Sequence, residues 1–281
     1  MRLGLVSNVW SVQLAAGADL ADLVAAAADR GYRVIELRQK SLGGYESAPD
    51  HLPDVAALAA LSRSFPEMRF VAAYEVPFLK PDTGPCHRYF EAAVSVARAV
   101  AHERQPHVRL VDLSTTAEQL AACGAAAAGH TIARLTAALE EDDALLSVEN
   151  AWQPWPLLEA AIAAARTELG AAAGRLRICF DPCNFASIKE PTDAAAVLAS
   201  LSPEQVGMLH FKQRSAGRLD PVVGAGDVDW PRLLPVIVAR RLFGQALFEM
   251  AGHEQLWHNL ERSSAYLRRL WRKTGTGEPW G

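Results

Sequence analysis

Four residues of types that bind metal ions close four separate hydrophobic runs in the second half of the chain. They are Glu149, Asp181, His210 and Glu249. A side chain that closes a parallel strand lies at the carboxyl edge of its sheet, where parallel α/β folds build their sites. Three carboxylates and one imidazole suit a hard or borderline divalent cation such as Mn²⁺, Mg²⁺, Co²⁺ or Zn²⁺. The pattern therefore predicts one metal site. The runs are Leu145–Glu149, Leu176–Asp181, Val206–His210 and Ala246–Glu249.

Each of these residues, taken alone, also has a structural explanation. A Glu or Asp at a strand end often caps a helix or forms a salt bridge. A histidine in an apolar run such as Met208–Phe211 is often a hydrogen-bonded core residue. Because the four residues fall on four successive runs, a shared site explains them better than four coincidences do.

Strand-like and helix-like stretches alternate along the whole chain. The strands recur at intervals of roughly 30 to 40 residues, about the length of one βα unit. Eight such units predict a single-domain (β/α)8 TIM barrel. The predicted strands are Arg2–Ser7, Val34–Leu37, Arg69–Tyr74, Val108–Leu113, Leu145–Glu149, Arg177–Asp181, Gly207–Phe211 and Ala246–Glu249. The predicted helices include Leu20–Arg30, Asp54–Arg63, Tyr89–His102, Thr131–Glu140, Leu157–Leu169, Asp193–Leu201, Trp230–Arg240 and Glu254–Trp271.

A doubly wound open sheet is the alternative architecture. Such a fold favours a glycine-rich turn after its first strand, and Ser7–Trp10 does not resemble GxGxxG. No linker divides the chain. We expect one barrel domain over residues 1–272 and a flexible tail over residues 273–281.

Composition narrows the class of function. The chain has 281 residues, half of them hydrophobic, and a net charge of −4, which disfavours a nucleic-acid groove. No apolar run approaches the roughly 20 residues that span a bilayer. The start lacks the pattern of a signal peptide, and the four cysteines show no CxxC pair. We expect a cytoplasmic protein with a small-molecule substrate and no nucleic-acid or membrane partner, and we leave homo-oligomer formation open.

The alternation of strand side chains adds neighbours to the four ligands. Residues two apart share a face, so Arg38 accompanies Glu36 and Lys212 accompanies His210. Arg214 joins them if the strand continues. We expect Glu36 and Arg38 to bind substrate hydroxyls, and Lys212 or Arg214 to stabilise negative charge. Crowded carboxylates would repel one another and raise their pKa values, and a divalent cation removes that conflict.

Tryptophans follow two of the predicted strands. Trp10 comes after the first strand, and Trp152 and Trp155 come after the fifth. Aromatic walls often stack on sugar rings or exclude water from a site. Covering helix ends is an equally good explanation. We retain Trp10 and Trp152 as predicted substrate-binding residues.

Local motifs around the four ligands resemble those of the xylose isomerase-like TIM-barrel superfamily, also called the sugar phosphate isomerase/epimerase family. The resemblance covers nearly the whole chain. The matching segments are Val148–Asn150 ("EN"), Phe180–Phe185 ("DPxN"), His210–Lys212 ("HxK") and Val223–Trp230 ("GxGxxDW"). It implies a TIM barrel with Glu149, Asp181, His210 and Glu249 as metal ligands. The implied cofactor is one divalent ion, for which we expect Mn²⁺ first.

Three positions depart from the family's pattern. Many of its epimerases have a histidine where this chain has Asn184, which we expect to bind substrate. Some of its dehydratases have a histidine at the position of Ala151, and Gln213 replaces an aspartate. The substrate is therefore not determined by these motifs.

The glycine loop before Trp230 has a structural interpretation of its own. Gly224 and Gly226 permit tight turns, and Asp229 can cap the next helix. We favour this interpretation over phosphate binding by the loop, because the loop contains no Lys or Arg.

The first functional hypothesis is an isomerase or epimerase acting on a keto sugar, a sugar phosphate or a related polyol. Glu149 and Glu249 would move the proton next to a carbonyl, and Lys212 would stabilise the enediolate. The alternative is a dehydratase of the same superfamily, of the inosose or dehydroshikimate type. An endonuclease IV-like hydrolase is disfavoured because Phe70–Tyr74 and Val108–Leu113 contain no histidine. A non-catalytic barrel subunit would be favoured if no metal binds.

Overall fold

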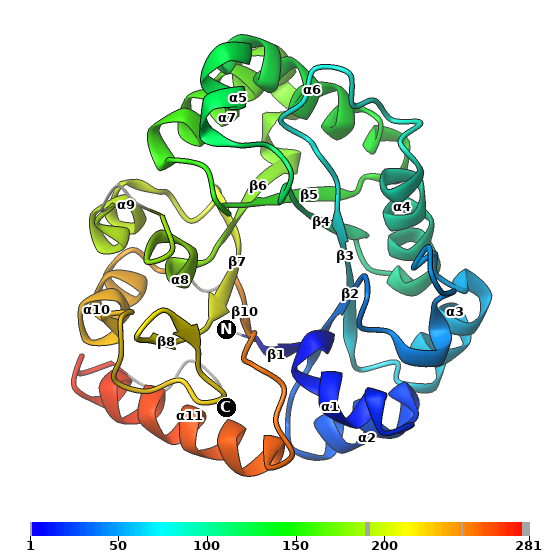
Figure 1. Cartoon of the computed structure of the whole chain (residues 1–281), viewed down its shortest axis with the longest axis vertical. Coiled ribbons are helices and arrows are strands. Elements are labelled where there is room, and N and C mark those ends of the chain that lie inside the picture. The colour runs from blue at the N-terminus through cyan, green and yellow to red at the C-terminus, as the bar shows by residue number, and fades with distance from the viewer. Residues whose placement is uncertain (1, 189–191, 243, 277–281) are drawn as a thin grey trace.

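The computed structural model describes residues 2–188, 192–242 and 244–276. Within these ranges, eight parallel strands close a barrel in the order β1-β10-β7-β6-β5-β4-β3-β2 (Figure 1). The chain is a single-domain TIM barrel, as the alternating pattern predicted. Its strands are β1 Arg2–Val6, β2 Val34–Arg38, β3 Arg69–Glu75, β4 His107–Val111, β5 Leu145–Glu149, β6 Leu176–Phe180, β7 Val206–Phe211 and β10 Gln245–Phe248.

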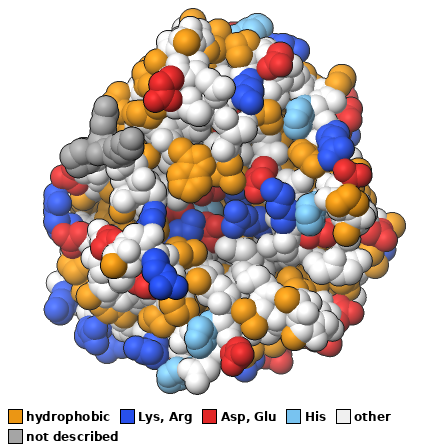
Figure 2. All heavy atoms as spheres, in the orientation of Figure 1, with side chains coloured by type: hydrophobic (Ala, Val, Ile, Leu, Met, Phe, Trp, Pro, Cys, Tyr) orange, Lys and Arg blue, Asp and Glu red, His pale blue; other side chains and the backbone are white. Residues whose placement is uncertain are grey.

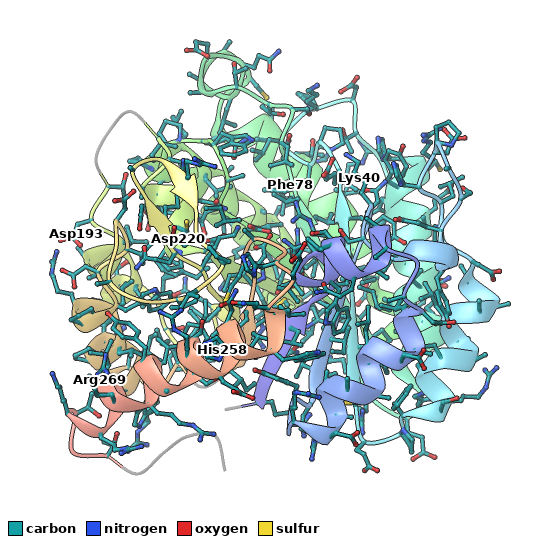
Figure 3. All side chains as sticks on the ribbon, turned by 60° about the horizontal axis from the view of Figure 1, so that its bottom comes forward. Lys40, Phe78, Asp193, Asp220, His258 and Arg269 are labelled. Carbon is teal, nitrogen blue, oxygen red and sulfur yellow. The ribbon has the colours of Figure 1, made fainter. Side chains whose placement is uncertain are left out.

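Amphipathic helices surround the strands on the outside (Figure 1). The long C-terminal helix, which carries His258 and Arg269, runs along this outer layer (Figure 3). The helices that follow the barrel strands are α2 Leu20–Asp29, α3 Val55–Ser64, α4 Arg88–Ala101, α6 Ala125–Ala137, α7 Trp155–Leu169, α9 Ala194–Ser200, α10 Trp230–Ala239 and α11 Leu256–Arg272. Three shorter helices, α1 Ser11–Ala15, α5 Ala117–Cys123 and α8 Pro182–Phe185, lie in connections.

Several predicted helices begin one residue too early because the predicted first residue is the N-cap. Asp54 accepts a hydrogen bond from the backbone N–H of Ala57, and Asp193 accepts one from Ala195. Asp229 caps α10 in the same way, as its place in the glycine loop suggested. A cap residue keeps extended backbone while its side chain satisfies a free N–H of the first turn.

The Ala-rich segment before residue 131 forms helix α5 and the first part of helix α6. Gly124, with φ +82°, separates α5 from α6. Thr116 and Gln119 form a capping box at the start of α5. The predicted helix Thr131–Glu140 therefore begins earlier, at Ala125, and ends at Ala137.

β7 does not continue far enough to place Arg214 on the same face as Lys212. It ends at Phe211, and Arg214 begins a separate two-stranded hairpin, β8 Arg214–Ser215 with β9 Arg218–Leu219. The condition under which Arg214 would share a face with Lys212, a continuing strand, is therefore not met. The backbone leaves the barrel here because Asp220 N–H donates to the carbonyl of Gln213, which closes the hairpin.

An apolar layer fills the middle of the barrel. Strand alternation places its members on the inward face: Val34 shares that face with Glu36, and Leu247 shares it with Glu249. The layer therefore lies directly beneath the strand-end residues and supports them. It consists of Val6, Val34, Val71, Cys179, Met208 and Leu247, all fully buried.

Two further expectations concern the end of the chain and membranes. Residues 273–276 continue from α11 in a turn, and the remainder of the predicted tail lies outside the described residues. Among the described residues, the helices are too short or too polar to cross a bilayer.

The contact between α6 and α7 yields a test of the packing. A Cβ at Gly129 would lie 2.6 Å from Ala164 Cβ and 2.8 Å from the carbonyl oxygen of Ala161. We expect Gly129→Ala to lower the free energy of unfolding by about 1–3 kcal/mol, because this overpacks two helices. Denaturant titration measures it, with Gly174→Ala as the control, since nothing lies within 4 Å of a Cβ there. Equal stability of the two variants would contradict the close packing.

Candidate metal centre

The four predicted ligands meet at the carboxyl end of the barrel. Glu149 ends β5, Asp181 directly follows β6, His210 lies in β7, and Glu249 directly follows β10. These four strands are neighbours in the barrel order. One ligand atom from each side chain lies within 4.8 Å of the others, and all four residues are buried. Among the described residues, strands distant in sequence thus assemble a metal-sized cluster of three carboxylates and one imidazole.

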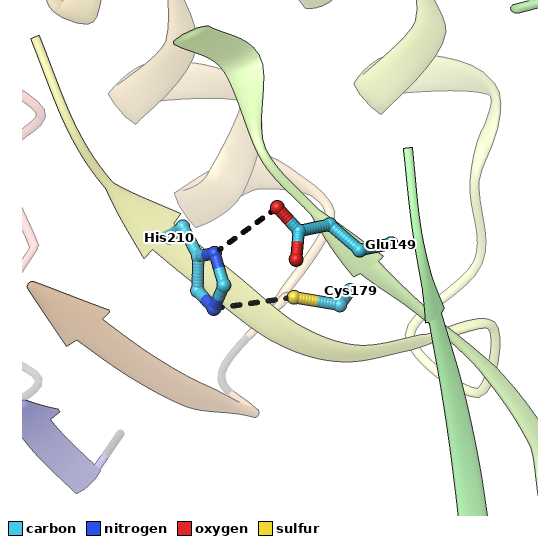
Figure 4. A group of neighbouring side chains, drawn as sticks. All are labelled: Glu149, Cys179 and His210. Carbon is cyan, nitrogen blue, oxygen red and sulfur yellow. Dashed lines mark hydrogen bonds and ion pairs between the residues drawn. The ribbon is translucent and has the colours of Figure 1, made fainter. Parts of the chain in front are cut away.

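His210 lies at the centre of the cluster with its two ring nitrogens in different surroundings. Nδ1 is 2.9 Å from Glu249 Oε2, 3.8 Å from Glu149 Oε1 and 3.9 Å from Asp181 Oδ2. Nε2 is 3.1 Å from Glu36 Oε2 and 3.3 Å from Cys179 Sγ (Figure 4). Burial would lower the pKa of His210, but the neighbouring acidic groups raise it well above its usual value, so the ring is protonated in the absence of a metal ion. A metal ion that displaces the Nδ1 proton would take that lone pair, while Nε2 continues to donate to Glu36. Metal-binding histidines are commonly oriented by such a carboxylate on the second nitrogen.

Two atoms of the cluster lack hydrogen bonds of acceptable geometry. His210 Nδ1 and Glu249 Oε2 are buried and only 2.9 Å apart, and neither makes a hydrogen bond of good geometry among the described residues, although Glu249 Oε2 also lies 2.8 Å from Lys212 Nζ. Unsatisfied buried polar atoms cost free energy. A cation bound between them would coordinate both, so the residues present fit a divalent metal ion.

Two cations of the chain neutralise the rim of the cluster. Lys212 Nζ lies 2.8 Å from both Asp181 Oδ2 and Glu249 Oε2, and Arg38 Nη1 lies 2.9 Å from Glu249 Oε1. Burial alone would lower the pKa of Lys212, but Asp181 and Glu249 outweigh it and raise that pKa. Lys212 is therefore held as an ammonium ion. Burial likewise opposes ionisation of Glu249, but Lys212 and His210 hold its pKa well below the usual value.

Arg109, which the sequence did not single out, supports the cluster from β4. Its Nη1 is 2.9 Å from Glu149 Oε2, and its Nε is 3.0 Å from Glu36 Oε1. Burial would raise the pKa of Glu36, but Arg109 and His210 lower it to about 2. For Glu149 burial prevails over Arg109, and its pKa is raised. A charged residue inside the apolar run Val108–Leu113 was the available signal for Arg109.

Glu36 occupies a different place from the one expected at the open mouth. Its side chain is completely buried behind His210, between that ring and Arg109. It orients the imidazole and balances the guanidinium. Arg38, two residues later, is 25% exposed and faces the mouth.

The motif residues Asn150 and Asn184 fix the cluster through hydrogen bonds. Asn150 accepts from the N–H of Asp181 and donates to its carbonyl, so the "EN" end of β5 locks the turn after β6. Asn184, on α8, donates to Glu149 Oε1 at 3.1 Å and to the carbonyl of Asn150. Asn184 thus lies beside Glu149, a predicted ligand, and its role in binding substrate stays a prediction.

Two other predicted residues, Arg214 and Trp10, make their contacts outside the cluster of the four predicted ligands. Arg214 donates to Ser187 Oγ and to the carbonyl of Gly217 in its hairpin. Trp10 is completely buried in the main core, whereas Trp152 is 49% exposed after β5. Figure 2 shows acidic and basic side chains gathered in a hollow at the centre of the face that carries the β8–β9 hairpin. Of the two tryptophans, Trp152 therefore remains the better substrate-wall prediction.

Gln213, which replaces an aspartate of the family motif, holds the glycine loop. Its Nε2 donates to the carbonyls of Gly224 and Val228, and its Oε1 accepts from the N–H of Val228. A Cβ at Gly226 would lie 2.5 Å from the carbonyl oxygen of Arg214, so only glycine fits there. These contacts give the loop the structural role that its sequence favoured.

Comparison with known proteins shows a fold match without sequence similarity. No protein-family model matches the chain, and no curated protein matches it in sequence. Among solved structures, a zinc-containing IolI protein aligns with 98% of both chains at 14% identity and a TM-score of 0.68. A xylose isomerase domain protein from Alicyclobacillus acidocaldarius aligns with 98% of this chain and all of its own at 16% identity and a TM-score of 0.65.

An L-ribulose 3-epimerase aligns with 98% of this chain and 95% of its own at 13% identity and a TM-score of 0.60. These likenesses show that the chain has the fold of xylose isomerase-like TIM barrels, as the motifs predicted.

The buried ion pairs of Arg109 yield a stability test. Arg109→Met leaves Glu36 and Glu149 without this partner, so we expect a loss of about 3–5 kcal/mol in the free energy of unfolding. Adding Glu36→Gln to that variant should restore part of the loss, because one uncompensated charge is removed. Arg232→Met breaks an exposed pair with Asp193 and should change little. Equal losses in Arg109→Met and Arg232→Met would contradict the network.

Metal binding can be measured directly. We expect the purified protein to bind one divalent ion per chain, and Asp181→Asn or His210→Ala to lose it, because each substitution removes a ligand charge or ring nitrogen. Elemental analysis and calorimetric titration with Mn²⁺, Zn²⁺ and Mg²⁺ measure it. The control is Glu75→Gln, which alters a strand-end carboxylate paired with Lys40 outside the cluster. Unchanged metal content in the ligand variants would exclude the centre.

Proposed function

We propose that the chain is a divalent-metal-dependent isomerase or epimerase of a keto sugar, a sugar phosphate or a related polyol. One observation carries this proposal. Glu149 and Glu249 come from the first and last of four adjacent strands and lie 3.8 Å and 2.9 Å from the same nitrogen, His210 Nδ1. Two carboxylates thus approach one centre from two directions, as proton removal and return at a carbon require.

The chemistry proposed for the metal is that of a Lewis acid. Glu149, Asp181, His210 and Glu249 would hold a divalent ion, with Mn²⁺ expected first, which would supply Lewis-acid polarisation of a substrate carbonyl and so acidify the neighbouring C–H. The donor set of three carboxylates and one imidazole also accepts Mg²⁺, Co²⁺ or Zn²⁺.

The residues of the chain divide the remaining tasks. One of Glu149 and Glu249, as a carboxylate, takes the proton next to the carbonyl, and the other, as a carboxylic acid, delivers its own proton to carbon on the same or the opposite face. Lys212, an ammonium ion beside Asp181 and Glu249, stabilises the negative charge of the enediolate. Arg38 pairs with Glu249 and is partly exposed at the mouth, so we assign it to binding a substrate hydroxyl.

The alternative is a dehydratase of the same fold. In that reaction a base removes a proton and water leaves. The ion pairs of Lys212 make it a poor base, because they stabilise the protonated form. The position after Asn150 that carries a histidine in some dehydratases is the buried Ala151. These two observations favour isomerisation or epimerisation.

An endonuclease IV-like hydrolase would need further ligands from the third and fourth strands. Among the described residues, β3 contributes no histidine, and the inward face of β4 carries Arg109 beside the cluster. A guanidinium cannot bind a metal ion. The geometry therefore supports a single-metal centre rather than a multi-metal one.

Solvent deuterium exchange tests the proposed reaction. In ²H₂O, a panel of keto sugars, their phosphates and inososes should contain a substrate whose C–H next to the carbonyl exchanges without loss of water. Glu149→Gln and Glu249→Gln should each slow this exchange by about 10²–10⁴-fold, because a group that transfers the proton is lost. Proton NMR measures the exchange, and elemental analysis establishes which variants retain metal.

Glu75→Gln is the matched control and should exchange like the parent protein. Retained exchange in both active-site variants would exclude this mechanism. Net loss of water from the substrate would assign the dehydratase instead.

A further inference from the structure

The amino-terminal mouth of the barrel, opposite the candidate metal centre, contains a cavity of about 610 Å³. Residues at the starts of the strands line it: Arg2 of β1, Arg69 of β3, His107 of β4, Arg177 of β6 and Gln245 of β10. This volume falls within the roughly 300–1,000 Å³ of small-molecule sites. The proposed isomerase or epimerase chemistry does not use it.

Three guanidinium groups at this mouth form no close ion pair. None of Arg2, Arg69 and Arg177 takes part in one among the described residues. Arg69 donates to the carbonyl of Gln105, but its Nε is buried without a partner. Glu204, which is exposed, is the one carboxylate among the described lining residues, and it interacts electrostatically with Arg177. The three arginines therefore outnumber the carboxylates of the cavity, which keeps an excess of positive charge.

Neighbouring groups respond to this positive charge. Burial lowers the pKa of Arg69, and Arg2 and Arg104 lower it further by repulsion. Burial also lowers the pKa of His107 to about 3, and Arg69 and Arg177 act in the same direction. His107 is thus a neutral ring that adds no charge of its own.

A nearly buried amide lies beside these arginines. Gln245 is only 9% exposed, and its Nε2 lies 3.2 Å from His107 Nδ1, while its Oε1 has no hydrogen-bond partner. Turned over, the amide accepts from His107 through Oε1 and leaves its NH₂ group without a partner instead. In either orientation, one end remains able to bond a ligand oxygen or hydroxyl.

The cavity wall also depends on the lack of a side chain at Gly207. A Cβ at Gly207 would lie 2.6 Å from Ser147 Oγ and 2.9 Å from Arg177 Cβ. Glycine therefore brings the backbone close to these two residues, and Ser147 in turn bonds His107 Nε2 at 2.8 Å. The wall beneath the arginines is built from interlocked residues rather than from loose surface chains.

We propose that this mouth binds a doubly charged oxyanion, either phosphate or the phosphoryl group of a small metabolite, among Arg2, Arg69 and Arg177. Guanidinium groups present paired N–H donors that match phosphate oxygens. A bound dianion relieves the repulsion between Arg2 and Arg69 and attracts Arg177, and the remaining volume accommodates an organic group.

Calorimetric titration of the full chain with inorganic phosphate at constant ionic strength tests the proposal. Arg2→Gln/Arg177→Gln should weaken binding by about ten-fold or more, because each arginine removes a charge-assisted hydrogen bond. Arg2→Gln alone, at an exposed position, should weaken it in the same direction without disturbing the fold. Two controls apply: Arg63→Gln removes one exposed charge elsewhere, and Arg38→Gln removes an arginine of the opposite mouth. Both controls should bind phosphate like the parent.

Phosphate binding that is unchanged in the double variant, or that weakens equally in Arg63→Gln, overturns the proposal. Loss confined to Arg38→Gln assigns phosphate to the metal-centre mouth and also overturns it. The two sources of the oxyanion are distinguished by glycerol phosphate: tighter binding than phosphate supports a phosphorylated metabolite, and weaker binding supports the free ion. The result does not depend on whether the barrel is an isomerase.

Discussion

The guanidinium of Arg109 joins the two carboxylates on which the position of His210 depends. It contacts Glu149, a predicted ligand, on one side and Glu36 on the other, and Glu36 reaches His210 Nε2. All of these groups are buried, and burial of an unpaired ion costs several kcal/mol. The network is therefore tolerated only when it is complete. The complete network holds the imidazole with Nδ1 toward the other predicted ligands. The charge of Arg109 on β4 thus determines the geometry of a cluster built on β5, β6, β7 and β10.

Amide side chains hold the backbone around this charged network. Asn150 binds both the N–H and the carbonyl of Asp181, which ties the end of β5 to the turn after β6. Gln213 does the same for the glycine loop through Gly224 and Val228. Amides suit this task because each carries a donor and an acceptor without adding charge. Ion pairs beneath the cluster therefore orient its side chains, and neutral amides hold the loops around it. Because the amides add no charge, they do not alter the net charge that a metal ion and a substrate would meet.

The barrel and the four strand-end ligands could be predicted because both depend on local sequence. Hydrophobic runs of strand length and their final residues are visible without knowing any contact. Arg109 could not be placed in this way, because its partner Glu36 lies 73 residues away and only barrel closure brings them together. The same reason explains why Glu36 was expected at the open mouth. The position of Arg214 depended on whether β7 continued past Phe211. It does not, because the backbone hydrogen bond from Asp220 to Gln213 closes a hairpin there. The family motifs pointed to the cluster of Glu149, Asp181, His210 and Glu249 but carried no information about which charges lie behind it.

Strand alternation also explains how one barrel carries opposite charges at its two ends. On β6 the inward face reads Arg177, Cys179 and then Asp181, and on β10 it reads Gln245, Leu247 and then Glu249. Each strand therefore passes from a polar or basic start, through the apolar layer, to an acidic end. The apolar layer keeps water out between the ends and separates guanidinium groups from carboxylates that would otherwise neutralise them. This separation allows the proposed cation site at one end and the proposed anion site at the other to lie on the same strands.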